Sequence, residues 1–196
     1  MNIEEDVKRI LDNDEEIVKM YKPNKKRFVF INFLFSGLVF NLIPIAIFLV
    51  GVLGLVGVIK FTTESGEPDP SLPVALMIFG GIGVIFLIVA CISFFVRYKK
   101  AYYFVTNKRL IIRGGFIGAD YKSLPLSTVG MLDVRVDFLD KLVKNNTGTI
   151  IFGSASTPVV NQQQQMMFAF HHIDDPYGTY KEIKEIVSSK QNEKVS

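Results

Sequence analysis

Cysteine is nearly absent from this chain of 196 residues, which contains Cys91 and no second thiol. A single cysteine excludes a disulfide within the chain and a metal site built from cysteines. Histidine is almost as scarce, since the chain has only the adjacent pair His171 and His172. Neighbouring residues on a strand point to opposite faces, so this pair is not expected to chelate one metal ion. We expect a structural role for both histidines and no metal site.

Charge is absent from two long stretches of the sequence. Residues 28–59 form a run of 32 residues without a charge, and residues 71–96 form another of 26. A helix needs about 20 apolar residues to cross the hydrocarbon core of a bilayer, so each run is long enough to span it. Two core helices of a soluble protein are not favoured, because both runs exceed the usual length of such helices. The sequence therefore predicts a membrane α-helical hairpin over residues 28–96, with a short outside loop at 60–70.

The same lack of charge bears on transport. Neither predicted span contains an ionisable side chain, and proton relays and ion pathways usually depend on one. A transporter or channel is therefore not favoured. Small residues recur instead and allow close helix packing, either within the hairpin or between protomers, at Gly51, Gly54, Gly57, Gly80, Gly81 and Gly83.

Positive charge gathers beside the two apolar runs. The residues concerned are Lys25, Lys26 and Arg27 before the first run, and Arg97, Lys99 and Lys100 after the second. The loop at 60–70 holds one basic and three acidic residues. The positive-inside rule then predicts a multi-pass protein of the cell membrane with both termini cytoplasmic. The six basic residues are expected at the membrane interface, where anionic lipid would attract them. Since the first 27 residues are polar, no cleavable signal peptide is expected.

Residues 1–27 are predicted to form a cytoplasmic lead. Apolar residues near its start recur at helical spacing, at Ile3, Val7, Ile10 and Leu11. This spacing favours a short amphipathic helix, lying on the bilayer or packed on the C-terminal domain. Residues 15–21 would instead extend as a strand. The sequence leaves open whether the lead contacts the rest of the protein.

Residues 97–189 are predicted to form a folded cytoplasmic domain. Short alternating or turn-bounded segments predict strands at 101–106, 109–113, 119–126, 132–137, 149–152 and 166–171, with a helical turn at 138–142. Asp175 suits a helix N-cap and Pro176 the first helical position, so a helix should follow them. We therefore predict a small β-barrel of antiparallel strands capped by a C-terminal α-helix. Residues 190–196 are expected to be a disordered tail.

No arrangement of side chains in the sequence predicts catalysis. Ser127 does not lie in a nucleophile elbow, and the glycines at 114–118 are followed directly by neither a Lys-Ser or Lys-Thr pair nor a helix, as a phosphate loop requires. No basic helix or aromatic stacking platform indicates nucleic-acid binding. We expect no enzyme, no cofactor, no small-molecule substrate and no nucleic-acid partner.

An ordered set of short motifs resembles a known family. A predicted hairpin precedes Tyr103-Phe-Val-Thr-Asn-Lys-Arg-Leu-Ile-Ile-Arg113, and then come Leu124-Pro-Leu-Ser127, Phe138-Leu-Asp-Lys-Leu142, Gly148-Thr-Ile-Ile151 and Ile173-Asp-Asp-Pro176. Together these resemble the bacterial pleckstrin homology (PH)-like family in its membrane-tethered form. The resemblance implies a PH-like barrel facing the cytoplasm and no catalytic residues. An insert at 145–147 and a glutamine-rich segment before the last strand depart from the family pattern.

Three functions follow as hypotheses. The first is a non-enzymatic membrane protein whose PH-like domain is an interaction or scaffold module at the membrane surface, binding a second copy or another membrane protein. The second is sensing of anionic lipid headgroups by that domain. The third, an accessory subunit of a transport system, lacks an intramembrane charge to support it. In each case the lipid bilayer is a partner.

Overall fold

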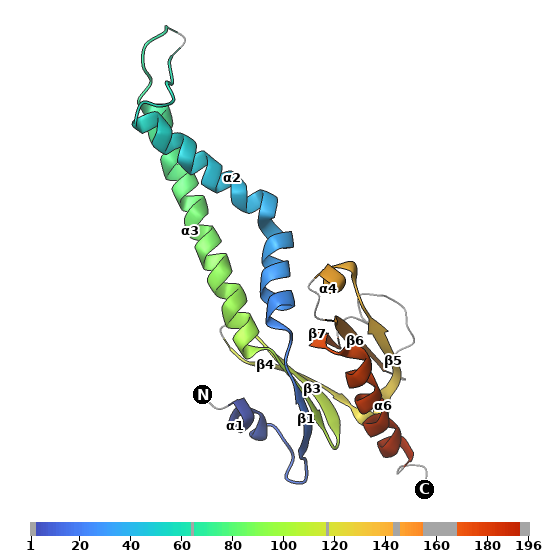
Figure 1. The fold of residues 1–196 in the computed structure, drawn as a ribbon. Coiled ribbons are helices and arrows are strands. Elements are labelled where there is room, and N and C mark those ends of the chain that lie inside the picture. Colours follow the sequence, from blue (N-terminus) through green and yellow to red (C-terminus); the bar gives the residue numbers. More distant parts are fainter. Residues whose placement is uncertain (1–2, 64, 117, 143–145, 155–167, 193–196) are drawn as a thin grey trace. The chain divides into compact units, whose positions relative to one another are not determined.

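The computed structural model describes residues 3–63, 65–116, 118–142, 146–154 and 168–192. The chain divides into two compact units (Figure 1). One comprises Met1–Phe28 and Arg97–Ser196, called here the β unit, and the other comprises Val29–Val96, called the helical unit. The lead that the sequence set apart therefore belongs to the β unit, which is assembled from two distant parts of the chain.

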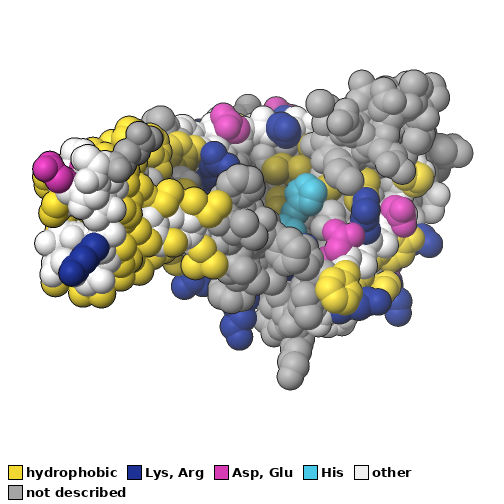
Figure 2. Space-filling view, turned by 90° about the horizontal axis from the view of Figure 1, so that it is seen from above, with side chains coloured by type: hydrophobic (Ala, Val, Ile, Leu, Met, Phe, Trp, Pro, Cys, Tyr) yellow, Lys and Arg dark blue, Asp and Glu magenta, His cyan; other side chains and the backbone are white. Residues whose placement is uncertain are grey.

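Helices α2 (Asn32–Leu55) and α3 (Ser71–Lys100) make up most of the helical unit. A π-helical segment, η1 (Lys26–Ile31), precedes α2, and Pro44 lies inside α2. By length and composition, α3 is the one helix among the described residues that is able to cross a membrane, and Leu42–Leu55 is a shorter apolar helical stretch. Most exposed large hydrophobic side chains of the structure belong to this unit, and Figure 2 shows them as a yellow surface.

Glycines bring α2 and α3 into close contact. A Cβ added to Gly51 would lie 2.6 Å from the backbone nitrogen of Met77, and one added to Gly83 would lie 2.5 Å from Cβ of Pro44. A Cβ at Gly80 would clash with the backbone of Phe48. Because later residues of α2 meet earlier residues of α3, the two helices run antiparallel. Close packing within the chain is therefore seen at four of the six predicted positions, Gly51, Gly54, Gly80 and Gly83, whereas Gly81 makes ordinary contact and an added Cβ at Gly57 would meet no described atom within 4 Å.

The first sheet of the β unit has four antiparallel strands in the order β1-β2-β3-β4. They are β1 (Ile17–Tyr21), β2 (Tyr102–Thr106), β3 (Arg109–Gly114) and β4 (Asp120–Pro125). The strand expected at residues 15–21 is thus present and pairs with β2, with Tyr21 opposite Tyr103. Helix α1 (Ile3–Lys8) lies on one face of this sheet, where Val7 packs with Phe104 and Ile111.

The second sheet has three antiparallel strands in the order β5-β6-β7. They are β5 (Val129–Arg135), β6 (Thr147–Ser154) and β7 (Ala169–Asp174), with a 3-10 turn, η2 (Leu126–Thr128), before β5 and helix α4 (Phe138–Leu142) before β6. The chain then forms α6 (Pro176–Asn192), which contacts η2, β5 and β6. Two antiparallel sheets capped by a C-terminal helix are the PH-like arrangement expected from the sequence.

The main core lies between the two sheets and α6. Tyr103 of β2 stacks on Phe170 of β7 with ring centroids 4.7 Å apart, and Phe152 of β6 packs edge-on against Phe170 at 4.8 Å. Ile183 and Val187 of α6 are buried in the same cluster. Side chains alternate along β2 and therefore contribute to two separate hydrophobic clusters. Tyr103 and Val105 face the main core, while Phe104 faces α1.

Several boundaries differ from the sequence prediction. β7 ends at Asp174 rather than His171, and α6 continues to Asn192, beyond the predicted start of the tail at residue 190. The expected cap is confirmed, since Gly178 donates its backbone N–H to Oδ1 of Asp175 at 3.1 Å. The glutamine-rich segment, residue 145 of the predicted insert and residues 193–196 of the predicted tail lie outside the described residues.

Candidate membrane-surface site

The last turn of α3 carries three of the predicted interface residues, Arg97, Lys99 and Lys100. Arg97 and Lys99 are exposed, and Lys100 is half-buried. Cations are favourable here because the C-terminal end of a helix bears partial negative charge, worth about 0.3–1 kcal/mol per charge. β2 begins at Tyr102, so Ala101 alone lies between helix and strand. The junction between the helix and the strand is therefore a single residue long.

A buried arginine fastens this helix end to the β unit. Arg113 of β3 is 1% exposed and donates from Nη1 to the backbone oxygen of Lys100 at 3.1 Å. Its Nη2 donates to Asp6 of α1 at 3.1 Å, and its Nε donates to the hydroxyl of Tyr121 at 3.2 Å. One side chain therefore joins α1, the end of α3 and β4.

The loop between β3 and β4 is held against the same helix end. The ammonium of Lys100 donates to the backbone oxygen of Phe116 at 2.8 Å and to that of Gly118 at 3.2 Å. The guanidinium carbon of Arg97 lies 5.6 Å from the ring centroid of Phe116, which is cation–π geometry. Phe116 remains 41% exposed. An exposed aromatic ring is thus placed beside the basic end of an apolar helix.

Lys22 occupies an aromatic site formed with the helix end and β2. Its ammonium lies 4.7 Å from the ring centroid of Tyr98 and 4.6 Å from that of Tyr102, and donates to the Tyr102 hydroxyl at 3.0 Å. Phe28 packs on Tyr98 at 5.9 Å. The residues just before the first apolar run therefore contact the residues just after the second, within the β unit.

The three basic residues before the first apolar run differ in their burial. Lys25 and Lys26 are exposed, which is the position expected for interface residues. Arg27 is 5% exposed, and its Nε donates to Oδ1 of Asp140 at 2.6 Å in a buried ion pair. The guanidinium of Arg27 is thus engaged inside the protein.

Asp140 is a buried carboxylate whose structural role the sequence did not predict. It is 1% exposed and also accepts from the hydroxyl of Thr147 at 3.0 Å and from the backbone N–H of Asp137 at 2.9 Å. Its place in the Phe138–Leu142 motif was the available signal, but nothing local shows that its partner lies 113 residues earlier. Asp140 ties α4 and β6 to the segment entering the first apolar run.

The two histidines lie at a bulge in β7. Between the pairs Gly148–Ile173 and Ile150–Phe170 the register shifts, and His172 adopts a left-handed backbone with φ of 58°. The bulge changes the simple alternation expected of the pair. Burial lowers the pKa of His172 to about 4, with help from the positive charge of Arg27. Its Nδ1 is buried, has no hydrogen bond to any described residue and lies 3.9 Å from Oδ1 of Asp140.

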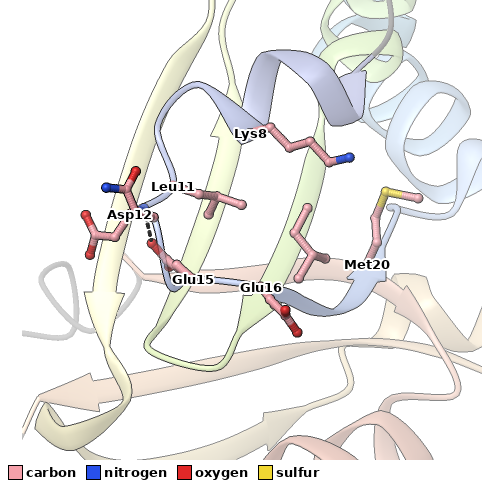
Figure 3. A pocket seen from close by; sticks show the side chains of 8 residues that line it. Lys8, Leu11, Asp12, Glu15, Glu16 and Met20 are labelled. Carbon is pink, nitrogen blue, oxygen red and sulfur yellow. Dashed lines mark hydrogen bonds between the residues drawn. The ribbon is translucent and has the colours of Figure 1, made fainter.

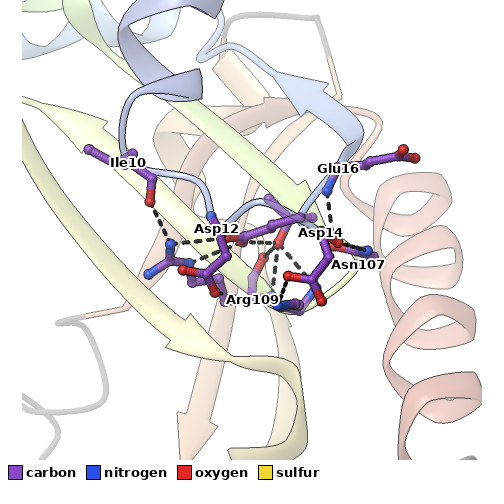
Figure 4. A network of polar contacts seen from close by, with 9 residues as sticks. Ile10, Asp12, Asp14, Glu16, Asn107 and Arg109 are labelled. Carbon is purple, nitrogen blue, oxygen red and sulfur yellow. Dashed lines mark hydrogen bonds and ion pairs between the residues drawn. The ribbon is translucent and has the colours of Figure 1, made fainter.

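A second polar network joins the lead to the β2–β3 turn (Figure 4). The side chain of Glu15 is fully buried and accepts from Arg109 Nε at 3.0 Å, Arg109 Nη2 at 2.9 Å and the Thr106 hydroxyl at 2.6 Å. Burial alone would raise the pKa of Glu15, but the hydrogen bonds from Arg109 and Thr106 outweigh it and lower that pKa. Lys108 pairs with Asp14 beside them. The β2–β3 turn is therefore a docking point for the lead.

A groove of about 620 Å³ lies between the start of the chain and β1 (Figure 3). It is lined by Lys8, Leu11, Asp12, Asn13, Glu15, Glu16, Ile17 and Met20. Asp12 and Glu15 in its wall are already engaged with each other and with the network of Figure 4. The described residues contain no group of three or more histidine, cysteine or acidic side chains placed to hold a metal ion.

Comparison with known proteins identifies the family of the chain. The family model described as Bacterial PH domain matches residues 34–186. The match begins within α2 and ends within α6, so it includes most of α2, the whole of α3 and the strands β2 to β7, whereas α1 and β1 precede it. No curated protein and no solved structure matches the chain.

Proposed function

We propose, because this chain belongs to the bacterial PH domain family, that it is a membrane-anchored protein whose PH-like domain is an interaction module at the cytoplasmic membrane surface. The observation that carries the proposal is the junction at Lys100. One helix is apolar enough to cross a bilayer and continues into the β unit, where Ala101 alone precedes β2. A domain joined this closely has little freedom to leave the bilayer surface.

The antiparallel helix pair supports a two-span anchor. α2 contacts α3 through glycines, and basic residues lie at the ends of both apolar runs that adjoin the β unit. Positive charge at these ends favours a cytoplasmic β unit. In this arrangement α2 and α3 cross the membrane as a hairpin, and residues 60–70 face the outside.

Interaction with protein is the first activity we propose for the module. Its partner is a second copy of the chain or another membrane protein, since both are confined to the same plane. Chemical cross-linking in native membranes, followed by affinity purification and mass spectrometry, tests this. A cross-linked dimer or a recurrent membrane partner is expected. A chain that stays strictly monomeric and partner-free would contradict the proposal.

Anionic-lipid binding is the second candidate, favoured by the exposed side chains of Lys25, Lys26 and Lys99. Each charge near an anionic surface contributes about 1 kcal/mol. Nanodiscs that carry the full chain allow a direct measurement, the enrichment of phosphatidylglycerol over phosphatidylcholine among co-purified lipids. Replacing the three lysines with glutamine should remove the enrichment. Equal lipid retention by the two proteins would exclude this activity.

A further inference from the structure

Among the described residues of the β unit, six large hydrophobic side chains are exposed, namely Val18, Met20, Phe116, Met131, Phe138 and Tyr177. A single exposed apolar side chain needs no special explanation. Phe116 differs from the others because it contacts the end of α3, through the guanidinium of Arg97 at 5.6 Å from its ring centroid. Its surroundings therefore connect it to the apolar helix.

The backbone around Phe116 is held in place. Lys100 donates to the oxygens of Phe116 and Gly118, and the loop between β3 and β4 consequently lies beside the end of α3 (Figure 1). Gly115 has φ of 109°, and a Cβ there would lie 2.7 Å from the oxygen of Gly118. Only glycine tolerates this conformation and this close approach. The conformation of the loop therefore fixes the position of the Phe116 ring beside Arg97.

We infer that Phe116 inserts into the lipid interface beside the cytoplasmic end of α3, and that Arg97 and Lys100 hold it there. The inference rests on the proposed function, since it takes α3 as a membrane span. In that case the last turn of α3 lies at the headgroup level, where basic side chains extend toward the polar phase. A ring packed against Arg97 lies at the same level. Amphipathic elements at this level bury their apolar groups about 5–10 Å into the boundary between headgroups and acyl chains.

The absence of tryptophan from the chain makes a direct test possible. Three single-tryptophan variants of the full chain, Phe116→Trp, Phe86→Trp and Val18→Trp, would be placed in phosphatidylcholine nanodiscs. Bromines at shallow or deep positions of the acyl chains then quench any tryptophan within reach. Phe86 is 71% exposed on α3 and reports whether that helix is embedded. Val18 is 46% exposed and adjoins Ile17, which pairs with Thr106 at the end of β2 away from α3.

Phe116→Trp is expected to lose more fluorescence to shallow than to deep bromines and to emit at shorter wavelength than Val18→Trp. Phe86→Trp should also be quenched, and Val18→Trp should not. Quenching of Phe86→Trp without quenching of Phe116→Trp would overturn the inference and leave the membrane anchor intact. Equal quenching of Val18→Trp and Phe116→Trp would also overturn it. An unquenched Phe86→Trp would overturn the anchor and the inference together.

Discussion

At the residue scale, the pair formed by Arg27 and Asp140 joins the segment before the first apolar run to α4. Both side chains are buried, and Asp140 accepts two further hydrogen bonds. Burial of two charges is costly, so such a pair is weak evidence of net stabilisation. Removal of one partner, in contrast, is strongly destabilising, because the remaining charge stays buried without compensation.

We therefore expect Asp140→Ala to destabilise the β unit strongly, by about 3–5 kcal/mol. The midpoint of thermal unfolding of the purified protein in detergent measures this. Asp120→Asn is a suitable control, because Asp120 is exposed on β4. If Asp140→Ala unfolds at the same temperature as this control, the buried pair does not have the structural role given to it here.

His172 makes stability depend on pH. Its pKa falls from 6.5 to about 4 in the folded protein, through burial first and then the charge of Arg27. The unfolded chain therefore binds more protons than the folded one between these two values, and stability falls as pH is lowered from 6.5 towards 4. The loss attributable to this group is at most roughly 3 kcal/mol.

His172→Asn should reduce that pH dependence, because asparagine does not titrate and tolerates a positive φ. Thermal unfolding midpoints of the two proteins at pH 7 and at about pH 4.5, between the two pKa values, give the comparison. The wild type is expected to lose more stability over this interval than the variant. Equal losses would show that other groups control the acid sensitivity.

At the element scale, contact between α2 and α3 depends on particular glycines rather than on glycine content. A Cβ at Gly80 would meet the backbone of Phe48, whereas one at the adjacent Gly81 would lie 3.7 Å from the Phe48 ring, which is ordinary contact. The sequence showed both residues as equivalent small positions. Only the register of the helix pair distinguishes them.

Gly80→Ala is expected to separate or distort the helix pair and to cost roughly 1–3 kcal/mol through overpacking. Gly81→Ala is the matched control and should cause no loss. Thermal stability in a mild detergent, read by helical circular dichroism, measures both. Similar behaviour of the two variants would argue against the close contact at Gly80.

At the scale of the whole molecule, sequence patterns identified local elements well. The alternation at 132–137, the Asp175-Pro176 helix start and the two uncharged runs each reflect the residues of one segment. Pairings between distant segments were not predictable in this way. β1 pairs with β2 although the entire helical unit separates them in the sequence, and Glu15 contacts Arg109, which lies 94 residues later in the chain. The bulge at His172 escaped prediction because its cause is the register of β6 against β7.

We propose that two membrane spans anchor the β unit at the cytoplasmic face. The single cysteine allows a direct measurement after Cys91→Ala, with one new cysteine at a time, Ser65→Cys in the loop or Ser188→Cys on α6. A membrane-impermeant maleimide is applied to intact cells and to permeabilised cells. The account predicts labelling of residue 65 in intact cells and of residue 188 only after permeabilisation. Identical labelling of the two positions, or the reverse pattern, would contradict it.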